Sequence, residues 1–230
     1  MAANNSSIFD DEEDDQQLMT PIIVVYLLIS LLGILLNSLT IAVIKLGRTT
    51  SKESAFQILN LAVADLISAM LYPPVVLMIR LRLTFNAGSA LCTILMFLDT
   101  ATFYASPLWN VAISIEKFIA VFFPLLMLTY SRKQKAIVAV VVWVVACLSQ
   151  FDTILYARVY TDASGPHCII KNPLKESNLQ LYDSILAVRF ILPASVIVCM
   201  YGLIGVKILF RKRIGDTPWK NISIERLKVC

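Results

Sequence analysis

Residues 21–44 read PIIVVYLLISLLGILLNSLTIAVI and contain no charged side chain. A helix rises ~1.5 Å per residue, so this segment is long enough to cross the ~30 Å hydrocarbon layer of a membrane. The mean hydropathy of the 230-residue chain is +0.75, which is too apolar for a soluble domain. Further apolar segments follow the first one, at 56–79, 91–123, 136–157 and 182–210. The pattern therefore predicts five membrane-spanning segments.

Backbone hydrogen bonding decides which fold these segments adopt. Lipid offers no hydrogen-bond partner, so an open sheet would leave its edges unpaired. A membrane β-barrel needs short strands in which apolar and polar residues alternate, and these segments do not alternate. Most connecting segments are short, which favours antiparallel packing of neighbouring helices. The sequence therefore predicts an all-α membrane protein, an antiparallel bundle of five transmembrane helices over 21–210.

Basic residues fall mostly on one side of the predicted membrane. Residues 1–20 hold the acidic run Asp10–Asp15 and no Lys or Arg. The opposite side collects the basic residues beside the first, third and fifth spans: Lys45, Arg48, Lys52, Arg132, Lys133, Lys135, Lys207, Arg211, Lys212, Arg213, Lys220, Arg226 and Lys228. The positive-inside rule then predicts an extracellular tail at 1–20 and a cytoplasmic tail at 211–230. This topology accounts for the net charge of +4, which therefore implies no nucleic-acid partner.

Two covalent features are expected on the extracellular side. The sequence NNSS begins overlapping glycosylation sequons at Asn4 and Asn5. Cys92 opens the third span, and Cys168 lies in the longest extracellular loop. Disulfides persist in that oxidising compartment, so we expect these two cysteines to pair. The alternative is that both remain free thiols.

Three polar residues are predicted at one depth inside the bundle. Asp65 lies ~14 Å from the inner end of the second span, and Ser106 lies ~15 Å from the same side in the third span. Asn37 lies at a comparable depth in the first span. A carboxylate at this depth must face protein, water or an ion. The group could form a monovalent cation or water site, or a hydrogen-bonded packing network.

Two opposite charges are predicted nearer the extracellular side. Asp99 lies two helical turns beyond Cys92, about 10 Å deep, and Arg189 lies at a similar depth in the fifth span. These side chains could pair with each other across the bundle. Alternatively, Asp99 binds a cationic ligand or Arg189 binds an anionic one.

The sequence SIEKFIAVFFP at 114–124 places an acid and a base side by side in an apolar run. Glu116 follows Cys92 by ~36 Å of helix, enough to cross the bilayer. Glu116 and Lys117 are therefore expected at the inner boundary, where a lysine can reach the head groups. Pro124 is expected to end the helix.

Several short motifs occur in order along the chain: LLNSLT with Asn37, NLAVADL with Asp65, FNAGSALC with Cys92, SIEKFIAVFFPL with Glu116, VVVWVV with Trp143, and FILPASVIVCMY with Pro193 and Tyr201. Together these motifs resemble the rhodopsin-like (class A) family of G-protein-coupled receptors. The resemblance implies a receptor that passes a signal from an extracellular ligand to a heterotrimeric G protein at the plasma membrane.

The resemblance also implies roles for individual residues. Asp65, Ser106 and Asn37 look like the family's sodium pocket, and Cys92 with Cys168 looks like its outer disulfide. The ligand site would include Asp99, Phe103 and Arg189. The inner switch that contacts the G protein would comprise Glu116, Lys117, Phe118 and Tyr201. Beyond a sodium ion, the resemblance implies no metal and no cofactor.

The sequence departs from the family pattern in three respects. Lys117 stands where the family has Arg, and an ammonium lacks the planar, forked donors of a guanidinium. Pro107 and Asn110 are unusual within the third helix. The motifs of the sixth and seventh helices do not occur. We therefore expect five of the family's seven helices, in a fragment or a short form that does not signal alone and that could associate with a full-length receptor in the membrane lipid.

Other classes of protein fit the sequence less well. A small five-span transporter or channel subunit could use Asp65, Asp99 and Arg189 to line a pathway, but transporters usually show internal repeats, and none is visible. An enzyme is not expected, because the chain has one histidine and no recognisable catalytic constellation.

Overall fold

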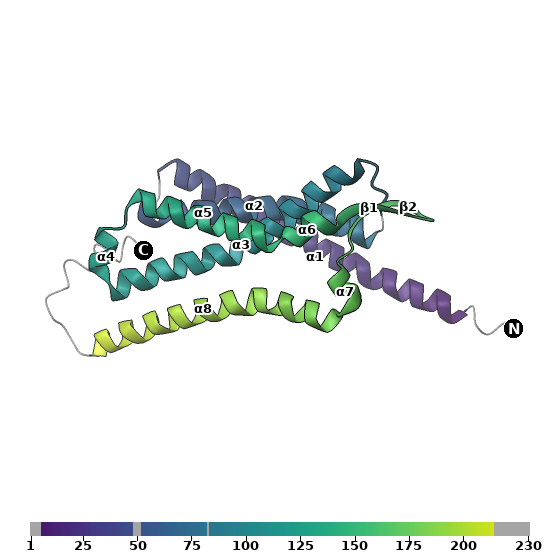
Figure 1. The fold of residues 1–230 in the computed structure, drawn as a ribbon. Helices are drawn as coiled ribbons and strands as arrows, with labels where there is room; N and C mark the ends of the chain where they lie inside the picture. Colours follow the sequence, from purple (N-terminus) through teal and green to yellow (C-terminus); the bar gives the residue numbers. More distant parts are fainter. Residues whose placement is uncertain (1–5, 48–51, 82, 214–230) are drawn as a thin grey trace.

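The computed structural model of the protein describes residues 6–47, 52–81 and 83–213 (Figure 1). The expected sequons at Asn4 and Asn5 lie outside the described residues, as does most of the basic tail, from residue 214 onward. The statements below concern the described part of the chain.

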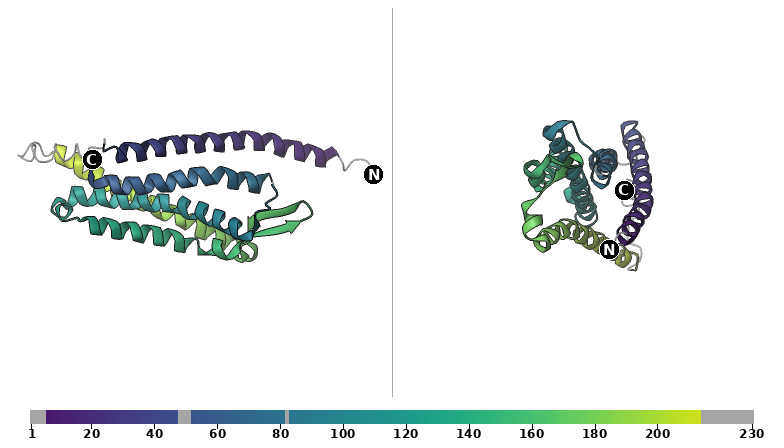
Figure 2. Two further views of the ribbon diagram at one scale, coloured as in Figure 1. Left: turned by 90° about the horizontal axis from the view of Figure 1, so that it is seen from above. Right: turned by 90° about the vertical axis from the view of Figure 1, so that its right-hand side faces the viewer.

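Five long helices run side by side along one direction (Figures 1 and 2). These are α1 (Ser6–Lys45), α2 (Lys52–Arg80), α3 (Gly88–Phe122), α5 (Arg132–Ser149) and α8 (Leu179–Arg213). Short elements connect them: α4 (Pro124–Leu128), α6 (Phe151–Tyr156), β1 (Ala157–Asp162), β2 (Gly165–Ile170) and α7 (Pro173–Ser177). We call the end of the bundle that carries β1 and β2 the hairpin end, and the opposite end, where α1 and α8 finish in lysine and arginine, the basic end.

Four of the described helices are long and apolar enough to cross a membrane: Pro21–Lys45, Ala55–Ile79, Gly88–Phe122 and Leu179–Phe210. α5 has 18 residues and begins with Arg132, Lys133 and Lys135, so its apolar part is shorter. The chain is thus a mostly helical membrane protein with four to five long apolar helices. The count of five spans remains a prediction.

Two helix boundaries differ from those predicted. α1 begins at Ser6 rather than near residue 21, so the acidic run is helical. Starting a helix is costly, but each residue added to an existing helix gains one hydrogen bond. The long apolar segment provides the existing helix, which then extends back through the acidic run. The segment at 136–157 is not one helix, because the backbone of Gln150 (φ −110°, ψ 20°) separates α5 from α6. The break turns the chain toward α3, where the Thr93 hydroxyl donates to the carbonyl of Ala157 at 2.6 Å.

The core of the bundle surrounds α3, which contacts α2, α5 and α8. Trp109 of α3 is fully buried against small residues of three helices, including Ala64, Ala105 and Ala146. Small side chains let helices approach closely, which favours packing where lipid provides no hydrophobic drive between helices. Beside this core the Trp143 indole N–H donates to the Asn60 side-chain oxygen at 3.2 Å, which joins α5 to α2.

A β-hairpin follows α6, in a segment that the sequence suggested only as a long loop. β1 and β2 pair antiparallel, with Val159 opposite Cys168. Cys168 is bonded to Cys92 at the start of α3, with their Cα atoms 5.6 Å apart, so the predicted disulfide is confirmed. Gly165 begins β2 with φ +122°, and a Cβ there would lie 2.9 Å from the Thr84 Cγ2 atom. Only glycine fits this turn without displacing the loop before α3.

The turn of the hairpin is held by one carboxylate. Asp162 accepts hydrogen bonds from the Ser164 hydroxyl at 2.6 Å and from the Ser164 backbone N–H at 2.8 Å. His167 Nε2 lies 3.3 Å from the same carboxylate oxygen, and His167 Nδ1 lies 3.2 Å from the Leu83 carbonyl oxygen. The hydrogen bonds from Ser164, aided by His167, hold the pKa of Asp162 below its ordinary value.

Loss of the disulfide is expected to destabilise the protein. Replacing Cys92 and Cys168 by Ser removes a cross-link over a sequence separation of 76, and should lower the free energy of unfolding by about 2–4 kcal/mol. Thermal unfolding in detergent would measure the change. The matched control replaces Cys147 and Cys199, which are free thiols. Equal melting temperatures for the two double variants would contradict this prediction.

The hairpin turn is expected to loosen in acid. Because the folded pKa of Asp162 is depressed, its stabilising effect is present above the ordinary aspartate pKa of ~3.9 and is lost as the pH falls through the folded pKa. Amide exchange around Ser164, normalised to intrinsic rates, should therefore speed up below pH ~4. Asp162→Asn should remove that pH dependence, whereas the exposed-site control Asp183→Asn should retain it.

Candidate functional site

α3 carries polar residues at three depths, and each depth contains candidate site residues. Asp99 lies toward the hairpin end, Ser106 lies near the middle and Glu116 lies toward the basic end. Asp99 and Ser106 are two helical turns apart, so they lie on a similar face of the helix. The surrounding helices determine what each side chain meets.

At the hairpin end, Asp99 is only 6% exposed. Its Oδ1 atom is buried and has no hydrogen-bond partner among the described residues. The predicted ion pair between Asp99 and Arg189 is not formed, because these two residues are not within 4.0 Å. The residue next to Arg189 on α8, Phe190, has the ring that contacts α3. Successive residues of a helix point about 100° apart, so Arg189 does not point in the same direction as Phe190.

Four aromatic rings form a continuous line at this level of the bundle. Tyr26 of α1 meets Tyr72 of α2 edge to face, with ring centroids 5.5 Å apart. Tyr72 stacks on Phe103 of α3 at 6.3 Å, and Phe103 meets Phe190 of α8 at 5.6 Å. Of these four, the sequence indicated only Phe103. The others come from separate helices, so no local motif could have grouped them.

In the middle of the bundle, the structure brings together two of the three residues predicted to form the sodium pocket. The Ser106 hydroxyl donates a hydrogen bond to the Asp65 carboxylate. Asn37 instead donates from its amide to the Gly33 carbonyl oxygen of its own helix, at 2.9 Å. α1 and α2 are joined close by, where the Ser30 hydroxyl donates to the carbonyl of Ala69. Asp65 and Ser106 offer the hard oxygen atoms that an alkali-metal cation prefers.

At the basic end, the predicted switch residues lie on two helices, with Glu116, Lys117 and Phe118 on α3 and Tyr201 on α8. Glu116 is buried, with 5% exposure, and Lys117 is half-buried. Phe118 turns to a separate ring cluster and stacks on Phe122 at 4.3 Å. Tyr201 is exposed on α8, in a different element of the bundle.

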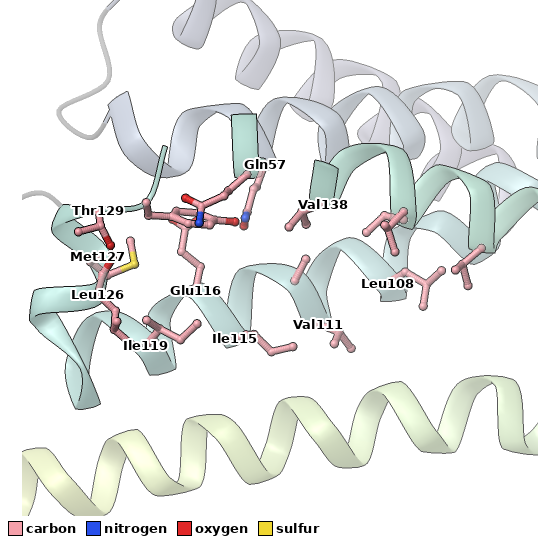
Figure 3. A pocket seen from close by; sticks show the side chains of 16 residues that line it. Gln57, Leu108, Val111, Ile115, Glu116, Ile119, Leu126, Met127, Thr129 and Val138 are labelled. Carbon is pink, nitrogen blue, oxygen red and sulfur yellow. Dashed lines mark hydrogen bonds between the residues drawn. The ribbon is translucent and has the colours of Figure 1, made fainter. Parts of the chain in front are cut away.

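A pocket of about 540 Å³ surrounds Glu116 between α2, α3, α4 and α5 (Figure 3). The polar members of its lining gather at the basic end: Gln57, Glu116, Thr129, Tyr130 and Gln134. The remaining lining is apolar and continues along α3 from Ile119 to Leu108. In Figure 3, Glu116 points from α3 toward Gln57 of α2 and away from α8. We call this cavity the inner pocket.

Two residues of the inner pocket were missed by the sequence reasoning. Gln57 is 1% exposed, and no hydrogen-bond partner for its Oε1 atom occurs within residues 6–47, 52–81 and 83–213. Burial and the nearby Glu116 charge raise the pKa of Tyr130, while a hydrogen bond from Gln57 partly offsets that rise. Gln57 lies just inside the second span, and a polar residue at that position could have been recognised in the sequence as a candidate site residue. Tyr130 lies in a connecting segment, and no sequence pattern pointed to it.

The sequence matches known proteins over most of its length. The profile of the 7 transmembrane receptor (rhodopsin family) matches residues 36–229. The human C-X-C chemokine receptor type 2 is 27% identical over 197 residues, covering 83% of this chain and 53% of that receptor. The Tachykinin-like peptides receptor 86C of Drosophila melanogaster is 25% identical over 202 residues, covering 84% of this chain and 40% of that receptor.

The chain belongs to the rhodopsin family of seven-transmembrane receptors. The family resemblance seen in the sequence is thereby confirmed, and the chain is a member of a receptor family rather than an enzyme. The chain spans about half the length of the curated relatives it matches.

The contact between Ser106 and Asp65 is expected to stabilise the bundle. Ser106→Ala leaves the Asp65 carboxylate without this donor and should lower the free energy of unfolding by about 1 kcal/mol. The matched control is Ser195→Ala, because Ser195 is exposed and its hydroxyl bonds only to the Leu192 carbonyl of its own helix. Thermal unfolding in nanodiscs would compare the two variants.

A double-mutant cycle separates this contact from the other effects of the substitution. Combining Ser106→Ala with Asp65→Asn should cost less than the sum of the single changes, since each removes the same hydrogen bond. Strict additivity would show that the two side chains do not interact.

Proposed function

We propose that the chain forms the ligand-binding and signalling framework of a receptor that couples an extracellular ligand to a heterotrimeric G protein. Family membership supports this function, and one observation within the bundle carries it. At the hairpin end α3 holds the buried carboxylate of Asp99, whose Oδ1 atom has no hydrogen-bond partner among the described residues, and at the basic end it holds a second buried carboxylate. Asp99 and Glu116 are separated by ~25 Å of one continuous helix, so α3 can link the two ends.

The proposed ligand site lies at the hairpin end. Its members are Asp99, Phe103 and Arg189, and the aromatic line places Phe103 between α2 and α8. A buried carboxylate oxygen that lacks a partner is costly, and a cationic group of a ligand would satisfy it. Arg189 could at the same time bind an anionic group.

The nature of the ligand is suggested by the relatives. The matched receptors are named for chemokines and for tachykinin-like peptides. A peptide carries both cationic and anionic groups, which suits a site with Asp99 and Arg189 better than a simple amine does. We therefore propose a peptide or small protein as the ligand.

The remaining roles follow the same proposal. Glu116, Lys117, Phe118 and Tyr201 would form the switch that contacts the G protein. Asp65 and Ser106, with Asn37 from α1, would hold a sodium ion that supplies positive charge at mid-bundle. The chain would lie in the plasma membrane with the hairpin end outside and the basic end in the cytoplasm. Among the described residues, Lys45, Arg132, Lys133, Lys135 and Lys207 lie toward the basic end, which supports this orientation through the positive-inside rule.

The ligand site can be tested by peptide binding to membranes of cells that express the full chain. A panel of synthetic peptides with cationic and anionic side chains would first identify a peptide that binds. Asp99→Asn should then weaken its binding by tenfold or more, the effect of losing a charge-assisted hydrogen bond. Asp183→Asn, a change at an exposed acid of α8, is the matched control.

Three outcomes distinguish the roles of the two charges. Loss of binding in Asp99→Asn alone would support a cationic anchor, and loss in Arg189→Gln alone would move the anchor to Arg189. Unchanged binding in both, with the Cys92–Cys168 bond intact, would contradict the proposed ligand site. A G-protein response of this chain to the bound peptide would contradict the expectation that it does not signal alone.

A further inference from the structure

The turn of the hairpin brings three possible metal-binding atoms together. Asp162 Oδ1, Ser164 Oγ and His167 Nε2 form a triangle with sides of 2.6, 2.9 and 3.3 Å. The atoms come from both arms of the hairpin, because Asp162 ends β1 and His167 lies in β2. The fold of the turn therefore collects a carboxylate, a hydroxyl and an imidazole at one point.

The three atoms have too few protons to satisfy one another. His167 Nδ1 lies 3.2 Å from the Leu83 carbonyl oxygen, which can only accept, so the neutral imidazole carries its proton on Nδ1. Nε2 then presents a lone pair to the carboxylate of Asp162. The Ser164 hydroxyl has one proton, which it can donate to Asp162 or to His167 but not fully to both. Two lone pairs therefore face each other where a cation would be stabilised.

The spacing of the carboxylate and the imidazole fits zinc. Zinc binds imidazole nitrogen and carboxylate oxygen in a tetrahedral arrangement, and at its usual bond lengths two such ligands are ~3.3–3.5 Å apart. Asp162 Oδ1 and His167 Nε2 are 3.3 Å apart. Calcium and magnesium prefer a shell of oxygen atoms, so the imidazole favours zinc over either of them.

Contacts outside the triangle hold these ligands in place. The Ser164 backbone N–H donates to Asp162 at 2.8 Å and fixes the carboxylate. The Leu83 carbonyl orients the imidazole, and metal-binding histidines usually have such an outer contact. Cys168, the residue after His167, is bonded to Cys92 and anchors β2. The site therefore needs little rearrangement to bind an ion.

The site is open to solvent on one side. The side chain of Asp162 is 56% exposed and Ser164 is exposed, whereas the side chain of His167 is 10% exposed. The hairpin projects from its end of the bundle (Figures 1 and 2). Within the described residues, no group of three or more His, Cys, Asp or Glu side chains is placed to hold a metal. Water would thus complete the shell of an ion at this site, which makes its binding reversible.

We propose that Asp162, Ser164 and His167 bind a zinc ion at the hairpin end. The ion bonds to His167 Nε2 and Asp162 Oδ1, the Ser164 hydroxyl supplies a third ligand atom, and a water molecule supplies the fourth. The bound ion links β1 to β2 across the turn and adds positive charge at the hairpin end. This site goes beyond the proposed receptor function and does not depend on it.

The single histidine of the chain makes the site directly testable, because a histidine-specific reagent reports on His167 alone. The chain is placed in phosphatidylcholine nanodiscs without a histidine tag. Modification of His167 by diethyl pyrocarbonate at neutral pH is followed by mass spectrometry. Zinc should slow this reaction about fivefold or more, since a coordinated nitrogen has no free lone pair. Magnesium should not slow it. Absence of protection by zinc, or equal protection by magnesium, would overturn the proposal.

A matched pair of variants tests the carboxylate ligand. Asp162→Asn keeps an oxygen that can accept from Ser164 but removes the charge, and should raise the half-protecting zinc concentration about tenfold or more. Asp183→Asn, at an exposed acid of α8, should leave it unchanged. Unaltered zinc protection in Asp162→Asn would show that the ion binds elsewhere. Non-reducing mapping of the Cys92–Cys168 bond checks that the hairpin has folded in each variant.

A proton is the competing occupant, because a second proton on the imidazole would also bridge Nε2 and Asp162. Nitrogen-15 NMR of the histidine-labelled chain at neutral pH distinguishes a free, a protonated and a metal-bound ring nitrogen. We expect Nε2 to be unprotonated without zinc and its resonance to shift when zinc is added. An imidazole protonated on both nitrogens before zinc is added would overturn the proposal.

Discussion

Polar groups within a membrane helix must find partners inside the protein, because the surrounding lipid supplies none. α3 is the helix on which this constraint acts most strongly. Ser106 satisfies it by donating to Asp65 of α2. Glu116 lies in the polar end of the inner pocket, where its charge acts on Tyr130. Asp99 retains one buried oxygen that has no partner in the described part of the chain. α3 contacts α2, α5 and α8.

Close packing around α3 depends on side-chain size as much as on polarity. Ala64 and Ala146 let α2 and α5 approach the fully buried Trp109. At the hairpin end the Cys92–Cys168 bond fixes the hairpin over the start of α3. α3 is therefore held along its length by contacts of different kinds, which makes it the element best placed to connect one end of the bundle with the other.

Several features of the site were predictable because they depend on residues close in sequence or on helix rise alone. The depths of Asp65, Asp99 and Glu116 follow from counting along a helix, and the pairing of Cys92 with Cys168 follows from their common compartment. Of the alternatives for Asp99 and Arg189, the ion pair is not formed, because depth along a helix does not fix the direction in which a side chain points. Rotation of α8 turns Phe190, not Arg189, toward α3.

The sequence by itself determined the class of fold, the family and the order of the long helices, because apolar length and motif spacing are local properties. Only the tertiary structure decided which side chains meet. The aromatic line, the hairpin held by Asp162 and the inner pocket with Gln57 each combine residues from separate segments. Their assembly depends on how helices rotate and pack against one another, and no local pattern in the chain records that rotation.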